Sequence, residues 1–258
     1  MKVKSCLIII LVTAAVLQLT AAPPALATLE RAKLVGIEYG GWWVVEVVPN
    51  ATWVGMDIYI SFPLDQSYAA VAKTIHSHGS VAAGALNPHT VDDGIKAALA
   101  LAAFGFDMII IDEGLSRGVW DASSFNKLYA QVKAKFPNVN VGMSDYDVQK
   151  LTSFLKKKAR TDFIAITVYQ DLAVGGKKKI DAVSSLGANY KIRSYAWFDF
   201  ADPIDNGKFA ELTNYAISKM NGVWFWQFAD INQGGWTGGD WCVKNLPYVK
   251  VLINQLHS

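Results

Sequence analysis

The sequence predicts a single (β/α)8 barrel of the TIM type, and three observations favour it. Short apolar segments alternate with helix-like segments along residues 28–258, and they form eight strand–helix units of which only the first lacks a convincing helix. A barrel of this type usually needs ~250 residues. No strand-to-helix turn carries G-x-G-x-x-G or a phosphate-binding Gly-Lys-Ser/Thr, which disfavours the competing doubly wound sheet.

The first 27 residues have the pattern of a secretory signal. Lys2 and Lys4 precede an apolar run from Leu7 to Leu19, and Ala25-Leu26-Ala27 fits the A-x-A cleavage rule. A retained membrane anchor is the alternative, but the run is shorter than the ~20 residues that span a bilayer. We therefore expect a signal peptide at 1–27 and an exported single domain at 28–258, with no membrane attachment after cleavage.

In the first half of the chain, β-branched and apolar runs end at residues that break strands. Gly40 follows the first run, Pro63 the second and Asn87-Pro88 the third, while Gly114 follows the fourth. The strands are expected at 34–39, 56–61, 80–86 and 107–112. Ala-rich or amphipathic segments between them predict helices at 66–78, 91–103 and 122–136.

The second half repeats the same alternation. Strands are expected at 140–143, 163–169, 191–198 and 223–228. Helices are expected at 148–159, 178–186, 209–220 and 247–256. We find no linker, low-complexity tract or other repeat, so the chain is predicted to form one domain.

Composition limits the partners of the protein. The formal net charge is +2, and the basic residues are scattered apart from 156–158 and 177–179, so nucleic acid is not an expected partner. Cys6 leaves with the signal and Cys242 then has no partner, so we expect no disulfide. There are four histidines and none lies on a late strand, so we predict no metal and no cofactor. The protein is expected to be a monomer.

The segment 104–114 is the centre of the predicted site. A buried strand of Met and Ile ends there on two adjacent carboxylates, Asp112 and Glu113, and breaks at Gly114. Buried carboxylates are costly unless they are paired or used. Either residue could donate a proton, because the charge of its neighbour raises its pKa. We favour Glu113 over Asp112 because its side chain is longer. The second carboxylate is left open among Asp145, Asp199 and Asp171.

Side-chain alternation predicts which residues face the barrel interior. Polar residues fall on the face that we assign to the interior in most strands, and a barrel core normally prefers apolar ones. This set is Glu38, Asp57, Asp145, Tyr169, Arg193 and Asp199, with one member of the Asp112–Glu113 pair. On the eighth strand, either Gln227 faces inward or both Trp224 and Trp226 do. Arg193 lies low on its strand and is expected to form a salt bridge with Glu38 or Asp57.

Aromatic residues near the strand ends favour a sugar ligand, because indole rings offer stacking area together with a polar group. We predict substrate contacts from Glu38, Asp57, Tyr59, Tyr169, Gln170, Trp197, Trp226 and Gln227. Glycosidic hydrolysis needs a proton donor and a second group for the oxocarbenium charge. The predicted function is therefore glycoside hydrolysis. The alternative is a non-catalytic barrel that binds glycans through its aromatic rim.

Two strands resemble those of chitinase-type glycoside hydrolases. The fourth strand of that family reads D-x-x-D-x-D-x-E and the sixth ends in M-x-Y-D. Here residues 106–113 keep the acidic ends but lack the middle aspartates and the spacer before Glu113, and the sixth strand keeps only Tyr169. The resemblance implies that Glu113 is the acid, Asp112 its partner and Tyr169 a transition-state contact.

Overall fold

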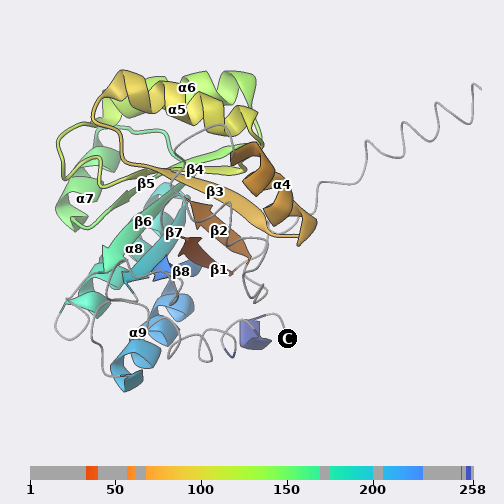
Figure 1. Cartoon of the computed structure of the whole chain (residues 1–258). Coiled ribbons are helices and arrows are strands. Elements are labelled where there is room, and N and C mark those ends of the chain that lie inside the picture. Colours follow the sequence, from red (N-terminus) through yellow and green to blue (C-terminus); the bar gives the residue numbers. More distant parts are fainter. Residues whose placement is uncertain are drawn as a thin grey trace, which may run out of the picture.

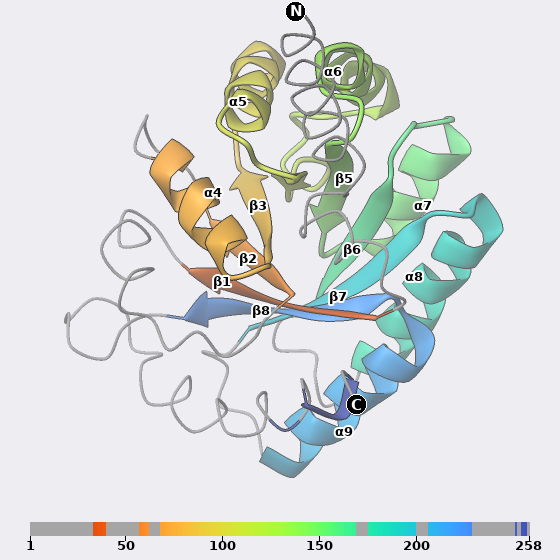
Figure 2. The same ribbon diagram turned by 90° about the vertical axis from the view of Figure 1, so that its right-hand side faces the viewer.

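The computed structural model describes residues 33–39, 57–61, 68–168, 175–199, 206–228, 251 and 254–256. Eight parallel strands in this part of the chain close into a barrel, in the order β1 to β8 with β8 paired to β1. Helices lie around the outside of the strands, and α5 and α6 lie side by side (Figures 1 and 2). The predicted (β/α)8 fold is confirmed.

The element bounds agree closely with the predicted ones. The strands are β1 (Leu34–Tyr39), β2 (Ile58–Ser61), β3 (Val81–Leu86), β4 (Met108–Asp112), β5 (Asn140–Asp145), β6 (Phe163–Val168), β7 (Arg193–Asp199) and β8 (Gly222–Phe228). The helices are α4 (Tyr68–Ser77), α5 (Val91–Ala103), α6 (Ala122–Lys135), α7 (Val148–Lys156), α8 (Gly176–Tyr190) and α9 (Asn206–Lys219). The helix predicted at 247–256 lies mostly outside the described residues, although 251 and 254–256 are helical.

Two separate apolar clusters lie on the two faces of the barrel wall. The outer cluster packs the strands against the helices and includes Ile109 and Ile111 of β4. The inner cluster fills the barrel and includes Met108 and Ile110 of the same strand. The alternation along β4 therefore assigns Asp112 to the interior face, with Met108 and Ile110.

Large aromatic side chains fill the interior because glycines face them. The ring of Tyr195 stacks on Trp224 with centroids 4.5 Å apart, and Phe163 meets Trp224 edge-on at 5.7 Å. A Cβ at Gly36 would lie 2.7 Å from the Trp224 ring, and one at Gly142 only 2.2 Å from the Phe163 ring. These two glycines leave the space that the rings occupy.

A repeated hydrogen-bond pattern joins the strands in pairs at the amino-terminal end of the barrel. The residue just before each even-numbered strand forms two hydrogen bonds with one residue of the preceding strand. Its side-chain oxygen accepts the backbone N–H of that residue, and its own backbone N–H donates to the carbonyl of that residue. We call this pair of bonds a strand clamp. The side-chain bonds are Val35 to Asp57 (3.0 Å), Ala82 to Asp107 (2.9 Å), Val141 to Asp162 (2.8 Å) and Ser194 to Asn221 (2.9 Å).

The strand clamps correct one predicted site residue. Asp57 was expected to face the interior and contact substrate, but Ile58 and Ile60 take the interior positions of β2. The Asp57 carboxylate is buried and holds the N–H of Val35, at the end of the barrel opposite Asp112. Arg193, also at the amino-terminal end, directs Nη1 to the Tyr195 hydroxyl at 3.5 Å.

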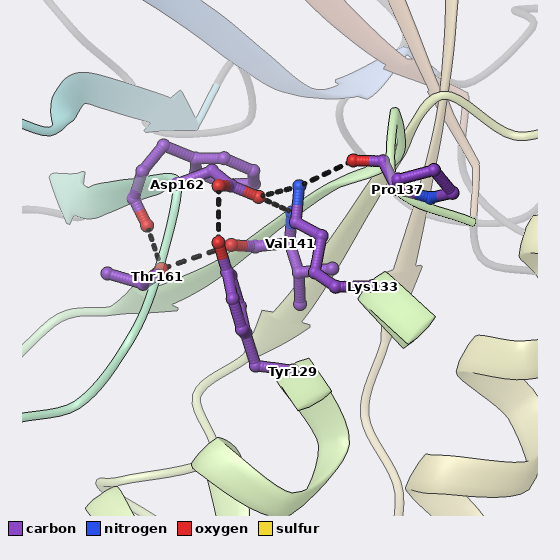
Figure 3. Close-up of polar contacts among 7 residues, drawn as sticks. Tyr129, Lys133, Pro137, Val141, Thr161 and Asp162 are labelled. Carbon is purple, nitrogen blue, oxygen red and sulfur yellow. Dashed lines mark hydrogen bonds and ion pairs between the residues drawn. The ribbon is translucent and has the colours of Figure 1, made fainter. Parts of the chain in front are cut away.

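Two of the clamp aspartates also bind helices. The Asp107 carboxylate lies 2.7 Å from Nε2 of His76 on α4, and this hydrogen bond raises the pKa of His76. Asp162 lies between two residues of α6, accepting from the Tyr129 hydroxyl at 2.8 Å and pairing with Lys133 at 2.8 Å (Figure 3). Burial, followed by the bond to Asp162, raises the pKa of Tyr129 to about 12. The clamps at Asp107 and Asp162 therefore link β-strand pairing to helix packing.

Of the helices in the described residues, none is long and apolar enough to cross a membrane. The predicted signal peptide at 1–27 and the residues Cys6 and Cys242 lie outside the described residues. The signal peptide and the export that follows from it stay predictions.

Replacing Asp162 should destabilise the barrel. Asp162→Ala removes the acceptor of the Val141 N–H and the Tyr129 hydroxyl, and leaves Lys133 without its carboxylate. We expect a loss of about 2–4 kcal/mol in the free energy of unfolding, measured by urea denaturation. The pKa of Tyr129 should fall in the same variant, which ultraviolet titration would detect.

The matched control is Asp92→Ala. Asp92 pairs with Lys127 at 3.6 Å, and both side chains are mostly exposed. This change should cost about 0–1 kcal/mol. Equal losses in the two variants would contradict the role given to the Asp162 clamp.

Candidate active site

Asp112 ends β4 at the carboxyl-terminal end of the barrel. This is the end at which TIM-barrel enzymes carry their active sites. The side chain is half-buried, and it follows Met108 and Ile110 on the interior face of the strand. The predicted pair of carboxylates at this strand end is therefore placed where catalysis occurs in barrels of this type.

The surroundings of Asp112 raise its pKa to about 7, from an ordinary value of 3.8. Burial is the largest cause, and the negative charge of Glu113 is the second. A hydrogen bond from Ser144 acts in the opposite direction, the charge of Asp145 raises the pKa further, and the charge of Arg117 lowers it. A carboxyl group with a pKa near neutrality can both donate and accept a proton at physiological pH.

A short chain of hydroxyl groups connects Asp112 to the next two strands. Ser144 of β5 donates to the Asp112 carboxylate, and its Oγ lies 3.3 Å from Oγ1 of Thr167 on β6. Both hydroxyl groups are buried. When Asp112 is ionised, Ser144 donates to it and can accept from Thr167, so the chain stabilises the carboxylate. Neither Ser144 nor Thr167 was among the predicted site residues.

Glu113 leaves the strand in a left-handed conformation, with φ of 51°. Its N–H still donates to the carbonyl of Ser144 at 2.9 Å, so the β4–β5 pairing continues by one bond before the chain turns. Non-glycine residues rarely adopt this conformation, and such positions cluster at functional sites. The turn places two consecutive carboxylates at the same strand end.

Asp145 does not face the barrel interior, which corrects the prediction that it is a catalytic residue. Val141 and Met143 of the same strand face lie in the outer cluster. The buried Asp145 carboxylate instead accepts the N–H of Ser116 at 2.8 Å, the Ser116 hydroxyl, and the N–H of Asp147 at 3.0 Å. Its role is to fix the loop at 113–121, between β4 and α6, against the start of α7.

Two residues at this end of the barrel were not among the predicted site residues. Arg117, in the loop at 113–121, is exposed, and Tyr146 directly follows β5 with 41% of its surface exposed. An exposed aromatic ring beside an active site can stack on a sugar. A signal for Tyr146 was present in the sequence, because it sits between Asp145 and the helix-capping Asp147, where the strand ends.

The interior aromatic residues agree in part with the prediction. Trp197 lies in the inner cluster, as expected, and so does Trp224, which matches the alternative with tryptophans facing inward on β8. The indole N–H of Trp197 finds no acceptor among the described residues. Trp120, by contrast, packs in the outer cluster beside Phe125 and is a core residue.

Several predicted site residues cannot be placed. Tyr169, Gln170 and Asp171 lie outside the described residues, as do the side chains of Glu38, Tyr59, Asp199, Trp226 and Gln227. Their roles stay predictions. Within the described ranges, no group of three or more His, Cys, Asp or Glu residues is arranged to hold a metal ion.

No protein-family model matches the sequence, and no curated protein matches it. Solved structures do resemble it in fold. An HpcH/HpaI aldolase from Desulfitobacterium hafniense has a TM-score of 0.58 at 11% identity, covering 87% of this chain and 95% of that chain. A 3-keto-L-gulonate-6-phosphate decarboxylase from Vibrio cholerae has a TM-score of 0.55 at 12% identity, covering 88% and 99%.

A glycosidase is also among the similar structures. An endo-beta-N-acetylglucosaminidase from Cordyceps militaris, solved as a mutant in complex with fucosyl-N-acetylglucosamine-Asn, has a TM-score of 0.58 at 12% identity, covering 93% of this chain and 96% of that chain. At these identities the likeness shows the fold alone. The scaffold is one that glycosidases, aldolases and decarboxylases share, so the reaction must be argued from the site.

The raised pKa of Asp112 has a consequence for stability. The folded chain holds this proton more tightly than the unfolded chain, so the stability that protonation contributes is complete below pH ~4 and is lost as the pH rises towards about 7. Asp112→Asn cannot ionise. It should therefore be more stable than the original protein by about 1–3 kcal/mol at pH 8, and equal to it at pH 4.

Urea denaturation at the two pH values measures this difference. Asp92→Asn, which neutralises an exposed carboxylate, is the control and should show no such pH dependence. A stability difference for Asp112→Asn that is the same at pH 4 and pH 8 would contradict the raised pKa.

Proposed function

We propose that the protein is a glycoside hydrolase in which Asp112 is the proton donor. The observation that carries the proposal is the position of Asp112, on the interior face at the carboxyl-terminal end of β4, with a pKa of about 7. Hydrolysis of a glycosidic bond needs an acid that is still protonated near neutral pH. The sequence analysis favoured Glu113 for this role, and the environment of Asp112 supports the other member of the pair.

In this mechanism the protonated Asp112 donates to the glycosidic oxygen as the bond to the sugar carbon breaks. The hydrogen bond from Ser144, itself next to Thr167, stabilises the carboxylate that forms. Glu113 carries the negative charge that offsets the developing oxocarbenium ion. Ionised Asp112 then takes a proton from the attacking water, which restores the acid.

Three further observations support a sugar as the substrate. Trp197 faces the interior with an unpartnered indole N–H among the described residues, and Tyr146 is exposed beside the site. An endo-beta-N-acetylglucosaminidase is among the proteins with this fold. Aldolases and decarboxylases share it too, so the paired carboxylates and the aromatic residues, rather than the fold, favour hydrolysis. We propose a monomeric, exported enzyme that needs no cofactor.

Sugar release from a broad polysaccharide panel, including chitin, tests the proposal. Asp112→Asn should lower the rate by about 10²–10⁴-fold, because it removes the acid, and Glu113→Gln should lower it as well. The rate with Asp112 intact should fall as the pH rises through about 7. Asp92→Asn is the control and should keep full activity.

The alternative is a non-catalytic barrel that binds carbohydrate. Glycan binding without sugar release in the original protein and in all variants would establish this alternative and exclude the hydrolase. Unchanged activity in Asp112→Asn with the fold intact would instead exclude Asp112 as the acid.

A further inference from the structure

The loop at 113–121 holds Arg117 in a fixed place beside the candidate active site. The N–H of Arg117 donates to the carbonyl of Glu113 at 3.0 Å. The residue before it, Ser116, is bound on one side by Asp145 and on the other by Lys150, whose Nζ lies 3.1 Å from the Ser116 carbonyl. The backbone of Arg117 is therefore anchored to β4, β5 and α7 together.

The guanidinium group of Arg117 reaches across to the loop that follows β3. Its Nη1 donates to the carbonyl of Asn87 at 3.2 Å, and its Nη2 lies 3.2 Å from Nδ1 of His89. Arginine has no acceptor, so Nδ1 of His89 must accept this bond. Both partners are uncharged in these contacts, and no carboxylate in the described ranges forms an ion pair with Arg117. Among the described residues, the guanidinium group is therefore oriented by hydrogen bonds but makes no direct ion pair.

We propose that Arg117 is a specificity-determining residue that binds an anionic group of the substrate, the carboxylate of a uronic acid residue. This inference rests on the proposed function and names its substrate class, an acidic glycan. The backbone of Arg117 is bonded to Glu113, the residue after Asp112, and the charge of Arg117 acts on the Asp112 carboxyl group, so an anion bound there is near the proposed acid.

The chemistry of the guanidinium group suits a carboxylate. Its five N–H donors form a planar fork that binds a carboxylate through two parallel bonds, and two of its nitrogens are already oriented by Asn87 and His89. Lys150 adds a second positive charge at the same loop, and Tyr146 offers an exposed ring for the sugar itself. A sulfate ester shares the negative charge but lacks the planar shape.

Substrate binding would also act on the proposed acid. The charge of Arg117 lowers the pKa of Asp112, and a bound anion would offset that charge. Asp112 would then hold its proton to higher pH when an acidic sugar occupies the site. A neutral sugar would not offset the charge of Arg117, so it would not raise the pKa of Asp112 in this way.

Binding to an array of neutral, uronate-bearing and sulfated glycans tests the inference. The assay uses Asp112→Asn as the background, so that no turnover occurs and binding is scored separately from hydrolysis. We expect binding to uronate-bearing glycans above neutral and sulfated ones. Adding Arg117→Met should weaken this binding about 10- to 100-fold, while Arg117→Lys should retain part of it.

Lys127→Met is the matched control, because it removes an exposed positive charge on α6 and should leave binding unchanged. A preference for neutral glycans, no binding to any acidic glycan, or a preference for sulfated over uronate-bearing ones would overturn the inference. An equal loss of neutral and acidic binding in Arg117→Met, with a lower melting temperature, would also overturn it and make Arg117 a structural link between the two loops. None of these results would exclude hydrolysis of a neutral glycan by Asp112.

Discussion

The strand clamps are the constraint on which the rest of this barrel depends. In a closed parallel sheet, each buried backbone N–H at a strand start needs an acceptor. Here a side-chain oxygen supplies it between the strands of every odd–even pair, from β1–β2 to β7–β8. Because Asp107 and Asp162 also bind α4 and α6, the same groups set strand pairing and helix position. The side chains at the amino-terminal end of the barrel thus stabilise the fold.

The buried and half-buried carboxylates of the described residues therefore have different roles that follow from their partners. Asp57 and Asp162 each accept a backbone N–H, and Asp145 accepts three donors from the loops around it. Asp112 has the hydroxyl of Ser144, and two neighbouring carboxylates act on it. Residues of one chemical type thus serve as structural acceptors where donors are fixed around them, and have a raised pKa where burial and negative charge dominate.

The sequence predicted the fold well because strand and helix periodicities are local properties. It also located the acidic strand end at Asp112 and the interior faces of β6 and β7. It failed for Asp57 and Asp145 because it assigned the polar residues of a strand to the interior, whereas fixed N–H and O–H donors bury both carboxylates away from the interior face. On β5, Val141 and Met143 suit either face, and the small Gly142 and Ser144 face inward only because Phe163 fills the space. That packing joins two different strands, so the sequence of β5 alone does not reveal it.

The near-neutral pKa of Asp112 is a balance of opposing effects. Because these effects come from several segments, the pKa could not be predicted from residues 104–114 alone. Burial and the charges of Glu113 and Asp145 raise it, whereas the hydroxyl of Ser144 and the charge of Arg117 lower it. Only Glu113 adjoins Asp112 in the sequence. Ser144 and Asp145 come from β5, and Arg117 is held in place through Asp145 and Ser116. The buried Asp145 therefore acts on Asp112 twice, through its own charge and by fixing the loop that carries the opposing one.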